Sequence, residues 1–542
     1  MDTNLTLLTD LYQLTMAQGY WQNDLADTQA CFYMHFRENP FHGGYTISCG
    51  AQHLAEFIDG FGFAQDDIDY LKRVPAPDGT PLFNGEFLDS LATLELSVDI
   101  DVAPEGEVVF PYEPIVRVIG PIMQCQLIET ALLNCINFPT LIATKAARVC
   151  QAAAGPVAEF GLRRAQGPNG GVTAARAAIV GGCASTSNVL AGKLYDLPVS
   201  GTHAHSWVMA FPSELAAFRA YAHAFPHNCV LLVDTFDVEQ GVRNAITVAH
   251  EMEADGQRLA GIRIDSGDLA WLSTKARKML DDDDLYYVKI VASNDLDEYT
   301  VQSLRKEQNA PIDSWGVGTR LATAYDQPAL GGVYKLSAKR ACQPSVSASA
   351  TNNAVPATNN AMPAPNNVTP TPNSVMQSSN NVMSAHSNVI PGLTRNPHED
   401  ARETTTWQPC MKATEQVRKS TLPGVLATRR YFDASGTMIG DMVYDATHGP
   451  TADRITDPLD ELRKKDLSAA AASHDILQPL VRAGKVAVKL LSAMQAQKNA
   501  ESNLASLDPS NKRLLNPHSY PVGLDDYVLS TRDELLKAAR GL

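Results

Sequence analysis

The middle of the chain repeats a short apolar run followed by a segment whose apolar residues have helical spacing. The runs lack the alternation of a half-exposed strand, which is typical of parallel strands covered on both faces. Their starts lie about 26 to 31 residues apart, the length of one βα unit. The runs are VSGTHAH from Val199, CVLLVDTFD from Cys229, AGIRIDSGD from Ala260, YYVKIVASND from Tyr286 and SWGVGTR from Ser314.

This rhythm predicts a (β/α) barrel of irregular spacing over residues 119–340, with a doubly wound open sheet as the alternative. The run AAIVGG, from Ala177, is interpreted as an earlier strand of the same set. Asp237 and Asp295 each precede a helical segment and are well placed to cap it. The predicted fold class is therefore α/β.

The two flanks of the barrel have a different pattern. Residues 1–118 combine short strands with a few helices and predict a mixed α+β N-terminal domain. Residues 406–542 predict a C-terminal extension that packs on the other domains. Within it the segment TRRYFDASGTMIGDMVY, from Thr428, has the pattern of a β-hairpin.

A low-complexity insert separates the barrel from this extension. Residues 341–394 contain no Lys, Arg, Asp or Glu, and a seven-residue unit recurs, as in TNNAVPA at Thr351 and TNNAMPA at Thr358. Recurrent Pro and Asn argue against a coiled coil. Such a composition cannot bury enough apolar area to order the chain, so we predict that residues 341–405 are disordered. A partner-binding tether is the alternative; deleting the insert would then abolish an interaction and leave catalysis unchanged.

The composition argues against several classes of protein. The 542 residues include 44 basic and 60 acidic side chains, which gives a net charge of −16. This balance argues against a nucleic-acid binder. No apolar run is long enough for a membrane span, and the start MDTNLTLLTDLYQ lacks the basic segment of a secretory signal. Nine dispersed Cys without a CxxC pair predict free thiols in a reducing cytoplasm.

The candidate chemistry lies where the predicted strands end, because a barrel carries its site at that face. GTHAH places His203 and His205 two residues apart at one such end. This pair is compatible with a metal-dependent hydrolase, with an imidazole that acts as acid, base or nucleophile, or with structural His. The later strand ends contain no His to complete a metal site.

RIDSGD supplies Arg263, Asp265 and Asp268 at another strand end. Alternation along the strand places Arg263 and Asp265 on one face, so the Arg can hold a carboxylate or phosphate. The two Asp can hold Mg²⁺ or orient a His or a hydroxyl group. A structural ion pair between Arg263 and Asp265 is the alternative.

Three further segments have weaker signals. In GVGT, Gly318 and Thr319 are compatible with a loop whose backbone N–H groups hold phosphate. Arg163 and Arg164 precede a Gly-rich turn and would suit an anionic substrate, although two solvated surface Arg fit equally well. Tyr12 lies beside an N-terminal helical Leu stripe, and chemistry alone gives it no role.

Taken together, the segments resemble nicotinate phosphoribosyltransferase, a type II phosphoribosyltransferase family. The resemblance covers nearly the whole chain outside the insert and rests on TDLYQLTMAQGYW, EGEVVFPYEPIVRVIGP, ETALLNCINFPTLIATKAARV, FGLRRAQGPNGG, GTHAHSW, RIDSGDL, ASNDLDE, GVGTRL, LGGVYKL, TLPG and NPHSYPV. It implies a barrel with a mixed N-terminal domain, and a homodimer with its sites near the subunit interface. The implied reaction forms nicotinate mononucleotide and diphosphate from nicotinate and 5-phosphoribosyl 1-diphosphate, coupled to ATP hydrolysis, in NAD salvage.

The resemblance also implies roles for individual residues, with Mg²⁺ carried by the substrate phosphates. His205 matches the family's phosphorylated His, and Asp265 and Asp268 are expected beside it in catalysis. The substrate-binding positions it implies are Tyr12, Thr202 and Arg263 for nicotinate, Gly318 and Thr319 for the phosphoribosyl group, and Arg163 and Arg164 for diphosphate. A nicotinamide-specific enzyme and the barrel hydrolase with His203 and His205 remain the alternatives.

Overall fold

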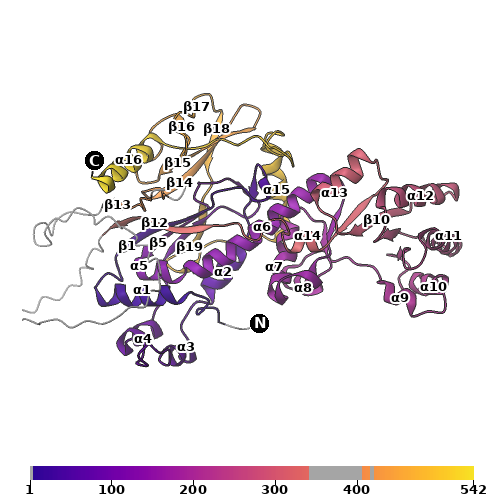
Figure 1. Ribbon diagram of the computed structural model, residues 1–542, viewed down its shortest axis with the longest axis horizontal. Coiled ribbons are helices and arrows are strands. Elements are labelled where there is room, and N and C mark those ends of the chain that lie inside the picture. The colour runs from indigo at the N-terminus through magenta and orange to yellow at the C-terminus, as the bar shows by residue number, and fades with distance from the viewer. Residues whose placement is uncertain (1–3, 341–405, 415–419, 542) are drawn as a thin grey trace, which may run out of the picture.

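The computed structural model of this protein describes residues 4–340, 406–414 and 420–541. The predicted disorder of residues 341–405 therefore falls outside the described residues. Three larger β-sheets organise the rest of the chain, with orders β13-β12-β1-β5-β3-β19-β20, β7-β6-β11-β10-β9-β8 and β17-β16-β21-β15-β14-β18. Helices lie beside all three sheets, which confirms the predicted α/β class (Figure 1).

The second sheet is the predicted parallel set. Its strands pair in parallel throughout, and the first strand, β6, pairs with the last, β11, through Trp315 and Val157. Sequential parallel strands whose first and last members pair have the order of a barrel. The strands are β6 (Val157–Glu159), β7 (Ser185–Thr186), β8 (Val230–Leu232), β9 (Gly261–Ile264), β10 (Lys289–Asn294) and β11 (Ser314–Val317).

The barrel is irregular on the side of VSGTHAH. This run contributes a single parallel bridge, between Val199 and Thr186, in place of the expected strand. Within the described residues no strand pairing is recorded between this run and β8. The gap is spanned by the side chain of His203, whose Nε2 accepts a hydrogen bond from the backbone N–H of Leu232 at 3.2 Å.

Two local predictions in this region were wrong. AAIVGG is the last part of helix α7 (Gly167–Val180), because a short buried apolar run has the same pattern in a helix as in a strand. Helix α13 (Glu298–Gln302) is capped by Asp297, whose side chain accepts from two backbone N–H groups, and Asp295 does not cap it. The predicted cap Asp237 is confirmed, since it accepts from the backbone N–H of Gln240.

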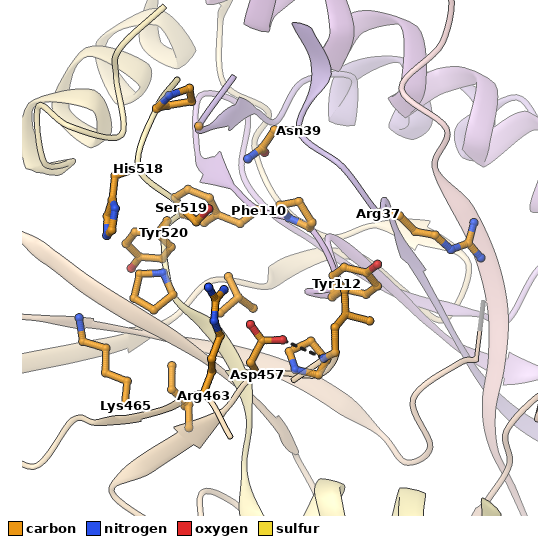
Figure 2. A pocket seen from close by; sticks show the side chains of 18 of the residues that line it. Arg37, Asn39, Phe110, Tyr112, Asp457, Arg463, Lys465, His518, Ser519 and Tyr520 are labelled. Carbon is orange, nitrogen blue, oxygen red and sulfur yellow. Dashed lines mark hydrogen bonds between the residues drawn. The ribbon is translucent and has the colours of Figure 1, made fainter. Parts of the chain in front are cut away.

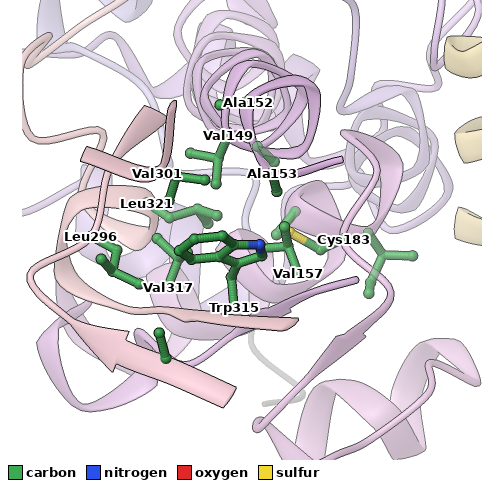
Figure 3. Packing of buried hydrophobic residues seen from close by; sticks show 14 of the residues in the cluster. Val149, Ala152, Ala153, Val157, Cys183, Leu296, Val301, Trp315, Val317 and Leu321 are labelled. Carbon is green, nitrogen blue, oxygen red and sulfur yellow. The ribbon is translucent and has the colours of Figure 1, made fainter. Parts of the chain in front are cut away.

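Helix α6 (Glu129–Ala153) packs against the barrel and forms much of its core. Trp315 of β11 is buried beside Val157 and Val317, with Val149 of α6 above it (Figure 3). Other helices near the barrel are α8 (Val189–Tyr195), α9 (His205–Met209), α10 (Glu214–Ala224), α11 (Val238–Ala254), α12 (Leu269–Asp282) and α14 (Thr319–Ala322).

The first sheet collects strands from three parts of the sequence. β12 pairs with β1, although its residues lie in the range predicted for the barrel domain. β19, from the C-terminal region, pairs with β3. The predicted domain limits 118, 340 and 405 remain predictions. The strands are β1 (Gln29–His35), β3 (Asp99–Val102), β5 (Val116–Pro121), β12 (Val333–Arg340), β13 (Gln408–Pro409), β19 (Gln478–Arg482) and β20 (Lys485–Val486).

The third sheet contains the predicted hairpin, β14 with β15, which pair antiparallel as expected. Arg430 of β14 is fully buried, and its guanidinium bonds Asp441 of β15 and Glu107, which precedes β4. The C-terminal sheet is thereby joined to the N-terminal region through a buried charge network. The strands are β14 (Leu426–Phe432), β15 (Met438–Asp445), β16 (Arg454–Thr456), β17 (Lys464–Asp466), β18 (Ala472–Asp475) and β21 (Val522–Leu524).

The remaining elements surround the first and third sheets. They are α1 (Leu11–Gln22), α2 (Ala51–Asp59), α3 (Gln65–Leu71), α4 (Gly85–Ala92), α5 (Ile122–Leu127), α15 (Ala493–Ser506), α16 (Asp526–Arg540) and the short pair β2 (Thr46–Ile47) and β4 (Val108–Val109). Among the described residues, none of the helices has the length and apolar character needed to cross a membrane.

Candidate active site

The predicted site residues gather mainly at the carboxyl ends of the barrel strands. Parallel strands end at the same edge of a sheet, so residues far apart in sequence meet there. His205 begins α9, Arg263 lies on β9, Asp265 follows β9, and Thr319 begins α14 after β11. This edge of the barrel is the candidate active site.

His205 lies between a hydroxyl group and a carboxylate. Its Nδ1 is 3.2 Å from Thr235 Oγ1, and its Nε2 is 4.0 Å from Asp265 Oδ2. The side chains of His205 and Asp265 are 41% and 37% exposed, so the imidazole is open to a bound molecule. A His held at one nitrogen and free at the other has the geometry of a nucleophile or a proton carrier.

Asp265 is oriented by two residues that were not assigned a role from the sequence. Ser293 Oγ of β10 donates a hydrogen bond to Asp265 Oδ1. Asp234 Oδ2, after β8, accepts from the backbone N–H of Asp265 at 3.0 Å and from Ser266 Oγ at 2.6 Å. Both are strand-end residues, and that position was the only signal the sequence contained for them.

Arg263 is a partly buried cation with unused donors. One Nη donates to the backbone carbonyl of His203 at 3.1 Å, and its Nε is buried with no hydrogen-bond partner among the described residues. Burial lowers the pKa of Arg263 and the nearby charge of Arg163 adds to this, while Asp265 and Asp234 act in the opposite direction. An anion placed against this guanidinium would satisfy the open donor.

His203 has different surroundings from His205. It is buried against Tyr221, with ring centroids 4.7 Å apart, and burial lowers its pKa to about 4. Its Nε2 already accepts from the backbone N–H of Leu232, so the ring is neutral and that nitrogen is not free for a metal. His203 therefore has the structural role, and the His203–His205 metal pair is not favoured.

The loops after β6 and β11 pack tightly against each other. A Cβ on Gly161 would lie 2.7 Å from the carbonyl oxygen of Gly318, so only glycine fits at that position. This contact places Arg163 and Arg164, exposed in the turn after β6, on the same edge as Thr319. Neither Arg forms an ion pair with any residue that the structure describes.

Three predicted residues occupy different surroundings. Thr202 is half-buried at this edge and donates to the carbonyl of His203. Asp268 caps α12, accepting from the backbone N–H of Trp271 at 3.0 Å. Tyr12 lies on α1, at the opposite end of the molecule from α9 (Figure 1). It is 48% exposed, and partial burial together with Glu129 raises its pKa to about 12.

A metal ion at this site would have to be bound by carboxylate oxygens. Across the ranges that the structure describes, no three His, Cys, Asp or Glu side chains are grouped as a metal site. Asp234 Oδ1 is nevertheless buried without a hydrogen-bond partner among those residues. With Asp265 it offers the oxygen ligands that Mg²⁺ prefers when substrate phosphates supply the others.

Comparison with known proteins identifies the family of this chain. Models of the nicotinate phosphoribosyltransferase N-terminal domain, family and C-terminal domain match residues 7–137, 156–344 and 427–532. The nicotinate phosphoribosyltransferase of Bacillus subtilis (strain 168) is 48% identical over 62% of this chain and 67% of its own length. The Homo sapiens enzyme of that name is 31% identical over 96% of this chain and 94% of its own.

Solved structures show the same likeness. The crystal structure of human nicotinic acid phosphoribosyltransferase matches with a TM-score of 0.74 and 28% identity, covering 97% of this chain and 99% of that one. A nicotinate-nucleotide pyrophosphorylase from Pyrococcus furiosus, 18% identical with a TM-score of 0.61, shares the fold. The chain belongs to the nicotinate phosphoribosyltransferase family.

Proposed function

We propose that this chain joins nicotinate to 5-phosphoribosyl 1-diphosphate, and that ATP hydrolysis is coupled to the reaction through phosphorylated His205. The observation that carries the proposal is the strand-end group of His205, Asp265 and Arg263, a nucleophile, its carboxylate and an anion-binding cation on one edge. In the reaction, the ring nitrogen of nicotinate bonds to the anomeric carbon while the bond from that carbon to diphosphate breaks.

Arg263 supplies the nicotinate end of the site. Its buried, unpartnered Nε faces no protein acceptor, and a pyridine carboxylate would fill that place with a charge-assisted hydrogen bond. Thr202, beside it on the same run as His203, supplies a hydroxyl group. A carboxylate held at this point fixes the ring nitrogen in line with the anomeric carbon, which lowers the entropic part of the barrier.

The diphosphate end is proposed for Arg163, Arg164 and the Gly318–Thr319 loop. The two Arg lack ion-pair partners among the described residues, so their charge is available to the leaving anion. Mg²⁺, when bound with the phosphates, would neutralise further charge there. Asp234 and Asp265 are the residues placed to hold it.

His205 is proposed to carry the phosphoryl group. If Nδ1–H donates to Thr235 Oγ1, Nε2 has a free lone pair directed toward the side of Asp265. Attack of Nε2 on the γ-phosphorus of ATP forms the N–P bond and releases ADP. The added negative charge beside Asp265 changes the affinity of the site for its anionic substrates, which is a route for coupling.

Tyr12 requires a second copy of the chain if it is to take part. Within one chain α1 and α9 lie at opposite ends, and Tyr12 is exposed on its helix (Figure 1). We therefore propose a homodimer in which α1 of one copy approaches the strand-end site of the other. Mixing the variants Tyr12→Ala and His205→Asn, each without ATP-stimulated activity alone, should restore that activity through mixed dimers. Absence of restoration, with mixed dimers present by mass, would contradict the shared site.

The direct test is incubation of the full chain with nicotinate, 5-phosphoribosyl 1-diphosphate and Mg²⁺, with and without ATP. Nicotinate mononucleotide should form, and ATP should increase its yield and label His205. His205→Asn should lose the label and the ATP effect. Nicotinamide in place of nicotinate should give little product; equal turnover of the two would support the nicotinamide alternative.

Arg263→Ala tests the assignment of the carboxylate. It should weaken nicotinate binding by about ten- to a hundredfold, the value of one hydrogen bond to a charged group, and leave 5-phosphoribosyl 1-diphosphate binding nearly unchanged. Arg258→Ala, which removes an Arg that packs over Tyr287 away from the site, is the matched control. An equal loss of affinity for both substrates would refute this role of Arg263.

A further inference from the structure

A large cavity lies away from the barrel edge. Its volume is about 730 Å³, within the range of small-molecule sites. It is bounded by the loop after β1, the segment between β4 and β5, the β16–β17 hairpin and the chain that leads into β21. The motif NPHSYPV, which the proposed reaction does not use, forms part of its wall.

The lining of this cavity is strongly basic. Its charged residues other than His are Arg37, Arg463, Lys464, Lys465 and Arg513 against Asp457, so five cations and one anion give 5 − 1 = +4. The whole chain has a net charge of −16. A local excess of positive charge on an acidic protein focuses the field on the cavity and attracts small anions, while the surrounding negative charge disfavours a nucleic-acid polymer.

Three of these cations, Lys464, Lys465 and Arg513, have no carboxylate partner in the described part of the chain. Arg463 has only the exposed carboxylate of Asp460, at 3.6 Å. Asp457, the one acidic lining residue, already accepts hydrogen bonds from the backbone N–H groups of Leu459 and Asp460.

One wall of the cavity is rigid. Tyr520 stacks on Phe110 with ring centroids 3.9 Å apart, and its hydroxyl group donates to Asp441 at 2.8 Å. Figure 2 shows Lys465, Arg463 and His518 on the same side of the cavity as Tyr520, whereas Arg37 points away from them. The basic groups near Tyr520 therefore come from two segments, residues 463–465 and residues 513–518.

We propose that this cavity is a second anion site, which binds a compact polyphosphate and is separate from the strand-end site. Cations on two walls match a ligand with several linked charges better than a single phosphate. An inorganic polyphosphate and a nucleoside triphosphate share this chemistry. The proposal does not depend on the reaction assigned to the barrel edge.

Calorimetric titration of the full chain with inorganic triphosphate tests the proposal. The wild type should bind at two sites, and Arg163→Ala/Arg164→Ala should weaken only the strand-end site. The variant Lys464→Gln/Lys465→Gln/Arg513→Gln should weaken the cavity site about tenfold or more. Lys485→Gln/Lys489→Gln/Lys498→Gln removes the same charge from exposed lysines outside the cavity and should bind as the wild type does.

A second measurement needs no variant. Inorganic triphosphate should protect Lys464 and Lys465 of the wild type from acylation, read by mass spectrometry, while Lys489 stays reactive. A nucleoside triphosphate that protects at lower concentration than inorganic triphosphate identifies the nucleotide as the source, and equal protection identifies the phosphate chain.

Two results would overturn the proposal. One is unchanged triphosphate binding in the cavity variant together with no protection of Lys464 and Lys465. The other is loss of the dimer in the cavity variant when the wild type has no second triphosphate site, which would assign these cations to a contact between copies.

Discussion

A buried charge network between α6 and α13 gives the sharpest test of the structure. Glu298 of α13 lies between Lys145 and Arg148 of α6, and the three side chains are at most 1% exposed. Arg148 Nε donates to Glu298 Oε1 at 2.9 Å. Lys145 Nζ is 2.6 Å from Oε2, an ion-pair contact without hydrogen-bond alignment, and 2.8 Å from Asp326 Oδ2.

Glu298→Ala should destabilise the protein by about 3–5 kcal/mol, the cost of leaving a buried charge without its partner. The substitution leaves two buried cations without their carboxylate partner. Asp326, which is 39% exposed, can compensate only the charge of Lys145. Glu298→Gln keeps the volume and one acceptor and should cost less. By contrast Glu251→Ala breaks the exposed pair with Arg219, whose side chains are 44% and 51% exposed, and should cost under about 1 kcal/mol.

Urea unfolding followed by tryptophan fluorescence measures these differences, because Trp315 is buried in the same core (Figure 3). The shift of the midpoint at constant slope reports the change in stability. If Glu298→Ala unfolds at the same urea concentration as Glu251→Ala, the network is solvated and the reasoning is refuted.

Two further predictions use single residues. His203, whose pKa is lowered from 6.5 to about 4, stays neutral when folded, so the unfolded chain binds more protons between these values and stability is lost as the pH falls from about 6.5 to 4. His203→Gln should flatten this pH dependence in urea titrations and exposed His250→Gln should not; identical slopes would contradict the buried neutral ring. Gly316→Ala would place a Cβ 2.6 Å from the Phe160 ring and should cost about 1–3 kcal/mol by overpacking. Gly19→Ala, inside α1 with no atom within 4 Å, should instead stabilise by up to about 1 kcal/mol, and a gain at both positions would show that β11 has room to move.

Several features that depend on local sequence were predicted correctly. Apolar runs at regular spacing identified β8 to β11, and the turn at Ser435 identified the β14–β15 hairpin. A cap such as Asp237 is also local, since the side chain bonds a backbone N–H three residues away. Strand-end position brought His205, Arg263 and Asp265 into one hypothesis, because parallel strands end at a common edge.

Contacts between distant segments were decided only by the tertiary structure. The two His of GTHAH are equivalent in sequence, but burial against Tyr221 and a bond to the Leu232 backbone make His203 structural and leave His205 open. Asp234 and Ser293 support Asp265 from neighbouring strands, which no spacing along one chain reveals. The remote place of Tyr12 and the basic cavity likewise depend on packing between domains, because non-local contacts are set by which faces can be buried together.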